Sequence, residues 1–116
     1  MPQITVEYSA SLDDSFDRRG FALALHPVIV ETVQARIAAC KTRFVRAEEF
    51  VVGGGGTDDA IVHVGIALLA GRTDEAKARL TEAVPGLVRQ YLKPADDSGT
   101  TVHISAETRD LDASYR

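Results

Sequence analysis

The sequence is poor in the residues that build disulfides and metal sites. Among its 116 residues there is one cysteine, Cys40, which excludes an intrachain disulfide and a cysteine-built metal site and suits a reducing cytoplasm. The three histidines, His26, His63 and His103, fall on different expected elements, with no pair four residues apart. They form no recognisable metal-binding motif, and we expect Cys40 to be a small buried hydrophobic residue.

An excess of positive charge and a long apolar run are also missing. The net charge is −4 and the 13 lysines and arginines are not clustered in runs, which argues against a protein that binds the phosphate backbone of nucleic acids. No apolar run approaches the length of a membrane span, and residues 2–9 alternate instead of forming the apolar core of a signal peptide. We expect a single cytoplasmic domain over residues 1–116.

Hydrophobic spacing divides the chain into two similar halves. Ile4, Val6 and Tyr8 alternate with polar residues, which is the period of a half-buried strand. The pattern predicts strands over residues 3–9, 38–52, 60–69 and 101–107, and helices over about 12–34 and 73–91. Each half, about 1–52 and 57–108, therefore has the order β-α-β. In the polar tail beyond them, Leu111 and Tyr115 are the expected anchors.

Both expected helices contain a proline. Ser11 is the expected cap of the first helix, with acidic residues behind it. Pro27 removes a backbone donor and clashes with the preceding turn, which predicts a kink or two helical pieces. Thr73 is a good cap for the second helix, whose middle is interrupted by Pro85.

These elements indicate an α+β fold, in which two helices cover one face of a four-stranded mixed sheet. The other face is then bare, and we expect it to carry apolar residues. A bare apolar face usually marks a surface that is buried by oligomerisation.

Four consecutive glycines, Gly53–Gly56, join the two halves. A glycine-rich loop can cradle phosphate, but here no Gly-Lys-Ser/Thr follows, and Asp58 and Asp59 would repel a phosphate group. We therefore interpret the run as a flexible turn, and Pro94–Gly99 as a second turn.

Pro2 becomes an N-terminal secondary amine if Met1 is removed. An N-terminal amine can accept a proton in catalysis. Its unperturbed pKa is about 7.7–8.0, and burial or nearby cations lower it further. Many chains begin with Met-Pro, so this dipeptide by itself is weak support for catalysis.

An ordered set of short segments extends over nearly the whole chain. The segments are Pro2 with Val6-Glu7-Tyr8-Ser9, Lys41-Thr42-Arg43, Val62-His63-Val64, Ala70-Gly71-Arg72-Thr73-Asp74-Glu75-Ala76-Lys77, Glu107-Thr108-Arg109-Asp110-Leu111-Asp112 and Tyr115-Arg116. This set resembles the 5-carboxymethyl-2-hydroxymuconate Δ-isomerase family of the tautomerase superfamily. The resemblance implies a tandem β-α-β fold of the tautomerase/MIF-like type, a homotrimer, no cofactor and a catalytic amino-terminal proline.

The resemblance also implies which residues act. The family reaction moves a proton between carbon atoms through a dienol, and it needs cations that hold carboxylates and developing negative charge. Pro2 would carry the proton, and the positions of Lys41 and Arg72 match functional arginines of the family. The chain departs from the family pattern by having Lys41 instead of arginine, which loses a planar two-pronged grip, and by having Gln3 where histidine is common.

The residue pattern adds two further candidates, Arg43 and Glu7, and a second reason to consider Arg72. Arg43 lies two residues after Lys41 on an expected strand, so both side chains project from one face; such a pair can bind a dicarboxylate and lower the pKa of a nearby amine. Arg72 precedes a helix N-terminus, which itself favours anions. Glu7 is a candidate supporting partner for a cation or a backbone donor. The alternative for each is an ordinary solvated or weakly paired surface residue.

Three functions remain open at this point. The first is a cofactor-independent isomerase that acts on an unsaturated dicarboxylate such as a 2-hydroxymuconate. The second uses the same site to add water to an unsaturated acid or to remove halide from it. The third is a non-catalytic trimer that binds a small acid, which is favoured if Met1 stays on.

Overall fold

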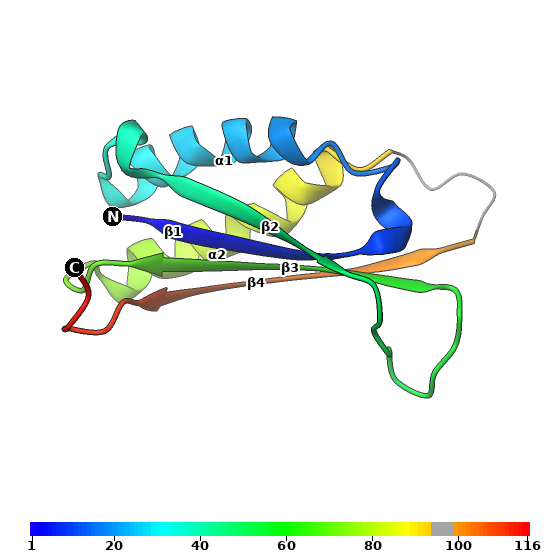
Figure 1. Cartoon of the computed structure of the whole chain (residues 1–116). Helices are drawn as coiled ribbons and strands as arrows, with labels where there is room; N and C mark the ends of the chain where they lie inside the picture. The colour runs from blue at the N-terminus through cyan, green and yellow to red at the C-terminus, as the bar shows by residue number, and fades with distance from the viewer. Residues whose placement is uncertain (94–98) are drawn as a thin grey trace.

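The computed structural model describes residues 1–93 and 99–116, and it consists of one sheet with two helices on one side (Figure 1). Short 3₁₀ turns at Ala10–Leu12 and Ile37–Ala39 precede the first helix and the second strand. Most of the expected turn at Pro94–Gly99 lies outside the described residues. The elements are β1 (Gln3–Ser9), α1 (Arg18–Val33), β2 (Lys41–Ala47), β3 (Asp59–Leu68), α2 (Asp74–Gln90) and β4 (Thr101–Asp110).

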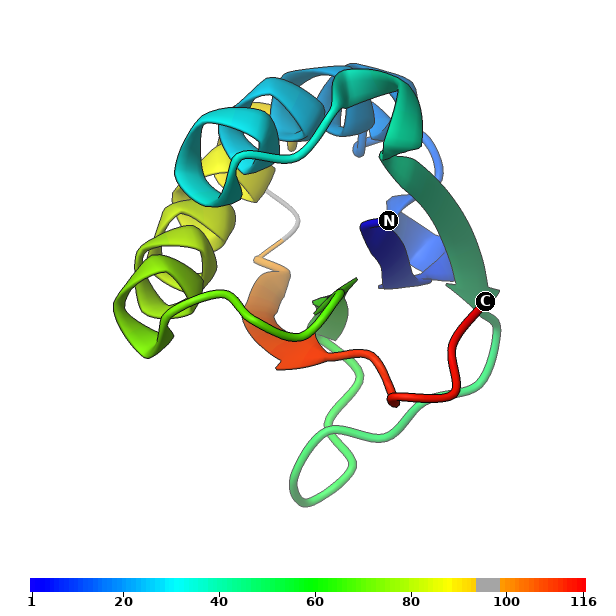
Figure 2. The same ribbon diagram turned by 90° about the vertical axis from the view of Figure 1, so that its left-hand side faces the viewer.

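The sheet is built from two β-α-β units that meet along their first strands. The strand order is β2-β1-β3-β4. Within each unit the two strands are parallel, β1 with β2 and β3 with β4, whereas β1 and β3 are antiparallel. The predicted mixed sheet with two helices on one face is therefore confirmed, and Figure 2 shows both helices on the same side of the curved sheet.

Helix α1 is continuous through Pro27, so the expectation of two helical pieces is wrong. Its cap is Asp17, whose carboxylate accepts a hydrogen bond from the N–H of Gly20 at 3.0 Å, and not Ser11, which lies in the preceding 3₁₀ turn. Every fourth residue is buried, and this stripe holds the helix on the core although proline removes one backbone bond. The buried residues are Phe21, Leu25, Ile29 and Val33.

Helix α2 repeats this arrangement. Thr73 caps it as predicted, because its hydroxyl accepts the N–H of Ala76 at 3.1 Å, and the helix continues through Pro85. The buried residues are again four apart: Ala76, Leu80, Val84 and Val88.

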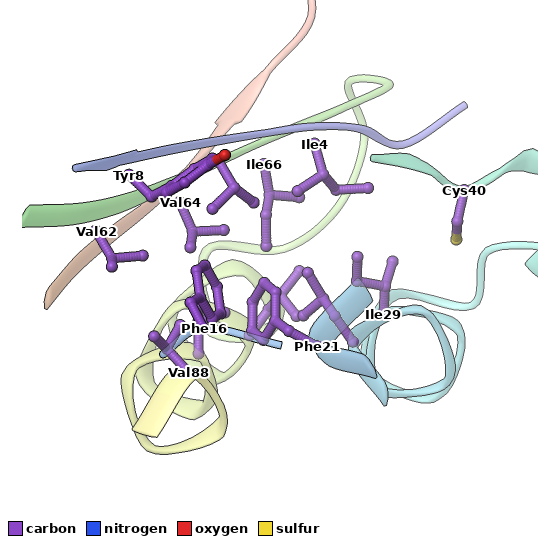
Figure 3. Packing of buried hydrophobic residues seen from close by; sticks show 14 of the residues in the cluster. Ile4, Tyr8, Phe16, Phe21, Ile29, Cys40, Val62, Val64, Ile66 and Val88 are labelled. Atoms are coloured by element: carbon purple, nitrogen blue, oxygen red, sulfur yellow. The ribbon is translucent and has the colours of Figure 1, made fainter. Parts of the chain in front are cut away.

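The core lies between the helices and the sheet. Figure 3 shows side chains of β1 and β3, among them Ile4, Val64 and Ile66, extending toward Phe21 and Ile29 of α1. Phe16 lies between these layers, with its ring centroid 6.1 Å from that of Tyr8 and 5.8 Å from that of Phe21. The alternation predicted for β1 is confirmed, since Ile4, Val6 and Tyr8 are all buried.

The uncovered face of the sheet is mainly polar, which corrects the expectation of an apolar face. Most of the strongly apolar strand residues are buried under the helices, so the alternate positions carry side chains such as Gln3, Thr5 and Glu7. The two strand histidines have partners there. His63 Nδ1 lies 2.6 Å from the hydroxyl of Ser105, and His103 Nε2 lies 2.7 Å from the carboxylate of Asp59.

Strand β2 is shorter than predicted and β4 is longer. Only Lys41–Ala47 of the expected 38–52 strand pairs with β1. At the end of β2, the guanidinium group of Arg46 forms salt bridges with the carboxylates of Asp13 at 2.8 Å and Glu48 at 2.7 Å.

Among the described residues, no helix combines the length and apolar character needed to cross a membrane.

Candidate active site

Pro2 is buried at the start of β1, where neighbouring strands hold its backbone. Its carbonyl accepts a hydrogen bond from the backbone N–H of Lys41 at 3.2 Å. The next residue, Gln3, lies opposite Lys41 of β2 and opposite Ala67 of β3. Pro2 therefore lies where β2 begins and β3 ends, and Figure 1 shows the N-terminus at this end of the sheet.

Lys41 brings a positive charge to this end of the sheet. Its exposed ammonium group donates to the carbonyl of Ala39 at 3.2 Å. Burial raises the pKa of the neighbouring Cys40 thiol, and the positive charges of Lys41 and of the N-terminal amine oppose that rise. The ammonium group of Lys41 and the N-terminal amine therefore both lie close enough to Cys40 to affect its pKa. Cys40 is 8% exposed, which confirms that it is buried.

Arg72 is fixed between the ends of two helices. It directly precedes the cap of α2, and its Nε–H donates to the carbonyl of Val33 in the last turn of α1 at 2.7 Å. Carbonyls of a last helical turn lack partners within the helix and attract cations. Since Arg72 follows the end of β3 after a turn at Gly71, it lies at the Pro2 end of the fold.

Arg43 lies on the uncovered face, where it contacts Gln3. Its Nη2–H donates to the side-chain carbonyl of Gln3 at 2.5 Å, and the side-chain amide of Gln3 donates to the hydroxyl of Tyr115 at 2.8 Å. Three side chains from β1, β2 and the C-terminal tail are thereby joined beside Pro2. The expected anchoring of the tail through Tyr115 is confirmed.

Glu7 lies farther along the sheet than the other candidates. It is five residues beyond Pro2, which corresponds to about 16 Å along a strand, and it lies opposite His63 of β3. Both residues line a hollow of about 270 Å³ on the uncovered face. The hollow is lined by Gln3, Thr5, Glu7, Arg43, His63, Gly65, Ala67, Glu107, Arg109 and Leu111.

The structure thus brings Pro2, Lys41, Arg43 and Arg72 to one end of the sheet. Glu7 lies farther along the uncovered face, where it lines the same hollow as Arg43. Sequence reasoning missed the contact between Gln3 and Tyr115, which are 112 positions apart, because no periodic pattern links a first strand to a tail. Within residues 1–93 and 99–116, no group of three or more histidine, cysteine or acidic residues could hold a metal ion.

Several solved structures share this architecture. A 5-carboxymethyl-2-hydroxymuconate isomerase from Deinococcus radiodurans R1 superposes with a TM-score of 0.84 at 20% identity, covering 99% of this chain and 87% of the other. A fused 4-OT symmetric trimer has a TM-score of 0.70 at 23% identity, with coverage of 94% and 85%. N1, a member of the cis-3-chloroacrylic acid dehalogenase family, has a TM-score of 0.70 at 18% identity, with coverage of 94% and 74%.

The fold is therefore the tautomerase/MIF-like fold. A family model described as 5-carboxymethyl-2-hydroxymuconate isomerase matches residues 2–116, so the chain belongs to that family and is an enzyme of the isomerase class. No curated protein sequence matches the chain.

Proposed function

We propose that this enzyme is a cofactor-independent tautomerase that moves a proton within an unsaturated 2-hydroxy or 2-oxo dicarboxylate, with the amine of Pro2 as acid and base. The observation that carries this proposal is the family match over residues 2–116 together with the place of Pro2, which is buried beside the first residue of β2. Loss of Met1 is part of the proposal, because the nitrogen of Pro2 behind Met1 is an amide without basicity.

The surroundings of Pro2 favour a neutral amine. Burial disfavours the charged form of an amine, and so do nearby cations. The free-base form is the one that can accept a proton from the substrate. The free amine accepts a proton from one position of the conjugated acid and returns it to a carbon atom at another position. The enzyme is then unchanged after each turnover.

We assign the cations at this end of the fold to the carboxylates of the substrate. Arg72 is anchored through Nε on Val33, and the N–H donors on its terminal nitrogens have a fixed direction in which to receive a carboxylate. Lys41 supplies a point charge, and Arg43 supplies a second guanidinium on the uncovered face. Their positive charge also stabilises the dienolate character of the transition state.

The test is an ultraviolet assay of the ketonisation of 2-hydroxymuconate by protein whose mass shows that Met1 is absent. We expect turnover, and we expect Pro2→Ala to lower kcat by about 10²-fold or more, in the range of general acid–base catalysis. Equal activity of Pro2→Ala and the wild type would remove Pro2 from the mechanism. Protein that retains Met1 in its native source would overturn the proposal as stated.

A second reaction at the same site is hydration of an unsaturated acid or removal of halide from it. It is favoured by the structural similarity to a member of the cis-3-chloroacrylic acid dehalogenase family. Release of halide from 3-chloroacrylate, measured beside the ketonisation assay, separates the two reactions. Halide release without ketonisation would contradict the tautomerase function and support dehalogenation at the same site.

We also infer that the chain assembles into a homotrimer. Apolar side chains are exposed on the flank of α1 and on the loop after β2, with Leu23 58% and Val51 80% exposed. A hollow of about 600 Å³ lies between α1 and β2, and Leu23 and Phe44 are among its lining residues. A symmetric trimer of the same fold supports this assembly.

Light scattering after size-exclusion chromatography tests the assembly. We expect three times the mass of the chain at micromolar concentration, and a clean monomer would contradict the inference. A trimer that binds a dicarboxylate but turns over neither substrate would instead support the third function, a small-acid-binding module.

A further inference from the structure

The side chain of Gln3 connects two parts of the proposed active site. It projects onto the uncovered face from the position next to Pro2, where Arg43 of β2 donates to its carbonyl oxygen and its own amide donates to Tyr115. These contacts join the first strand, the edge strand and the C-terminal tail at one point.

The chemistry of the partners decides the direction of each hydrogen bond. A guanidinium group can only donate, so the oxygen of the Gln3 carboxamide must face Arg43. The amide nitrogen must then face Tyr115, whose oxygen accepts. The hydroxyl proton of Tyr115 consequently points away from Gln3 and is available to another acceptor.

The tail reaches this point along a defined path. The backbone N–H of Leu111 donates to the carbonyl of Leu68 and extends the β3–β4 ladder, and Asp112 closes the next turn by accepting from the N–H and hydroxyl of Ser114. The tail then crosses from β4 toward β1 and β2, as the red segment in Figure 2 shows. Tyr115 is the residue that ties its end to Gln3.

We infer that Gln3 is a positioning residue, which holds Arg43 and the hydroxyl of Tyr115 beside Pro2 so that both donate to one carboxylate of the substrate. The inference rests on the proposed tautomerase function and adds the tail to its substrate-binding site. An ordered Arg43 offers its remaining N–H groups in a fixed orientation, and Tyr115 offers its hydroxyl proton. Neither group is the proton carrier, so their loss weakens substrate binding more than it slows the chemical step.

The experiment compares Gln3→Leu, Gln3→Glu and Tyr115→Phe with the wild type. Gln3→Leu removes both hydrogen bonds at similar side-chain size, and we expect KM to rise by about tenfold while kcat changes less than about threefold. Glutamate can only accept, so Gln3→Glu keeps the contact with Arg43 and turns the hydroxyl proton of Tyr115 toward itself. We expect Gln3→Glu and Tyr115→Phe to raise KM by a similar, smaller factor.

A second measurement does not depend on activity. Amide hydrogen exchange of residues 111–116 should become faster in Gln3→Leu, because the tail has lost its tie to β1. Gln90→Leu is the matched control, since it makes the same substitution at an exposed position at the end of α2, and it should change neither exchange of the tail nor KM.

The outcomes separate this inference from the proposed function. Unchanged exchange of the tail in Gln3→Leu would overturn the inference whether or not the enzyme is active. Faster exchange with unchanged KM, or a fall in kcat alone, would leave Gln3 a merely structural role and would also overturn it. Absence of activity that depends on Pro2 in the wild type would overturn the proposed function, and with it the positioning role, even if exchange of the tail becomes faster.

Discussion

Consecutive residues of β1 face opposite sides of the sheet and meet opposite environments. Ile4, Val6 and Tyr8 are buried under the helices, whereas Gln3 and Glu7 lie on the uncovered face among charged side chains. The covered face supplies most of the apolar burial that stabilises the fold. The uncovered face and the Pro2 end are therefore where polar and charged residues can be used for chemistry at little cost to stability.

The largest expected effect concerns the N-terminus. In a form of the protein whose Pro2 follows an N-terminal tag that is not removed, activity should fall by more than about 10²-fold, because an amide nitrogen cannot act as the base. The melting temperature should stay close to that of the untagged protein. Cleavage that leaves Pro2 first should restore activity. Full activity of the tagged form would show that the Pro2 amine is not the base, and it would contradict the proposal that the reaction takes place at the Pro2 end of the sheet.

A substitution on the covered face should lower the stability of the protein and leave its substrate binding unchanged. Phe21 is fully buried between the helices and the sheet, so Phe21→Ala should lower the free energy of unfolding by about 3–5 kcal/mol. Urea denaturation followed by circular dichroism measures the loss. The KM of the fraction that remains folded should equal that of the wild type, and an altered KM would show that the two faces are coupled.

Substitution of Arg72 tests a residue that bonds to the last turn of α1 and that we propose also binds the substrate. Arg72→Lys loses the planar group that bonds to Val33, and we expect KM to rise by about tenfold, in the range of one charge-assisted hydrogen bond. Arg79→Lys is a control for the same substitution, because Arg79 lies exposed on α2. A KM equal to that of the wild type in Arg72→Lys would remove Arg72 from substrate binding.

A smaller effect is expected at the start of α1. A Cβ atom at Gly20 would lie 2.9 Å from the ring of Tyr91 and closer still to the capping carboxylate of Asp17. Gly20→Ala should therefore disturb the cap and cost about 1–2 kcal/mol. Gly86→Ala on α2 is the control, since nothing lies within 4 Å of its Cβ position, and it should stabilise the protein by about 0.4–1 kcal/mol. Equal effects of the two would contradict the packing described at Gly20.

The smallest expected effect is a dependence of stability on pH. The hydrogen bond from Arg46 lowers the pKa of Asp13 below its usual value, against an opposing effect of burial. A lowered folded-state pKa stabilises the fold above the unfolded pKa of about 3.9, and this contribution is lost as the pH falls through the folded value. The melting temperature of Asp13→Asn should therefore fall less than that of the wild type between about pH 5 and pH 3. Identical pH profiles would exclude a role for this pair.

Much of the fold could be predicted because its strands and helices depend on sequence patterns among neighbouring residues. The alternation in β1 and the cap at Thr73 act over a few neighbouring residues, and both are present in the structure. The expectation of two helical pieces at Pro27 and the expectation of Ser11 as a cap were wrong for a tertiary reason. A buried stripe of four residues outweighs one missing backbone bond, and pairing of Asp17 N–H with the carbonyl of Tyr91 helps to set where α1 begins.

The site was predictable only in part. The order of motifs made Pro2, Lys41 and Arg72 candidates, and the topology brings these three residues to one end of the sheet. The polar character of the uncovered face was not predicted. The run of residues in β3 is nearly continuously apolar, so its sequence does not indicate which alternate positions face the helices. Residues 61, 63, 65 and 67 of that strand are in fact the less apolar side.

By itself, the sequence determined the two β-α-β units, the capped second helix and the family, since each depends on local spacing or on an ordered set of motifs. Only the tertiary structure decided that Arg72 bonds to the last turn of α1 and that Gln3 lies between Arg43 and Tyr115. These contacts join residues 39, 40 and 112 positions apart. They form only when parallel strand pairing and the returning tail bring those side chains to the same end of the sheet, and no local preference of the chain specifies that meeting.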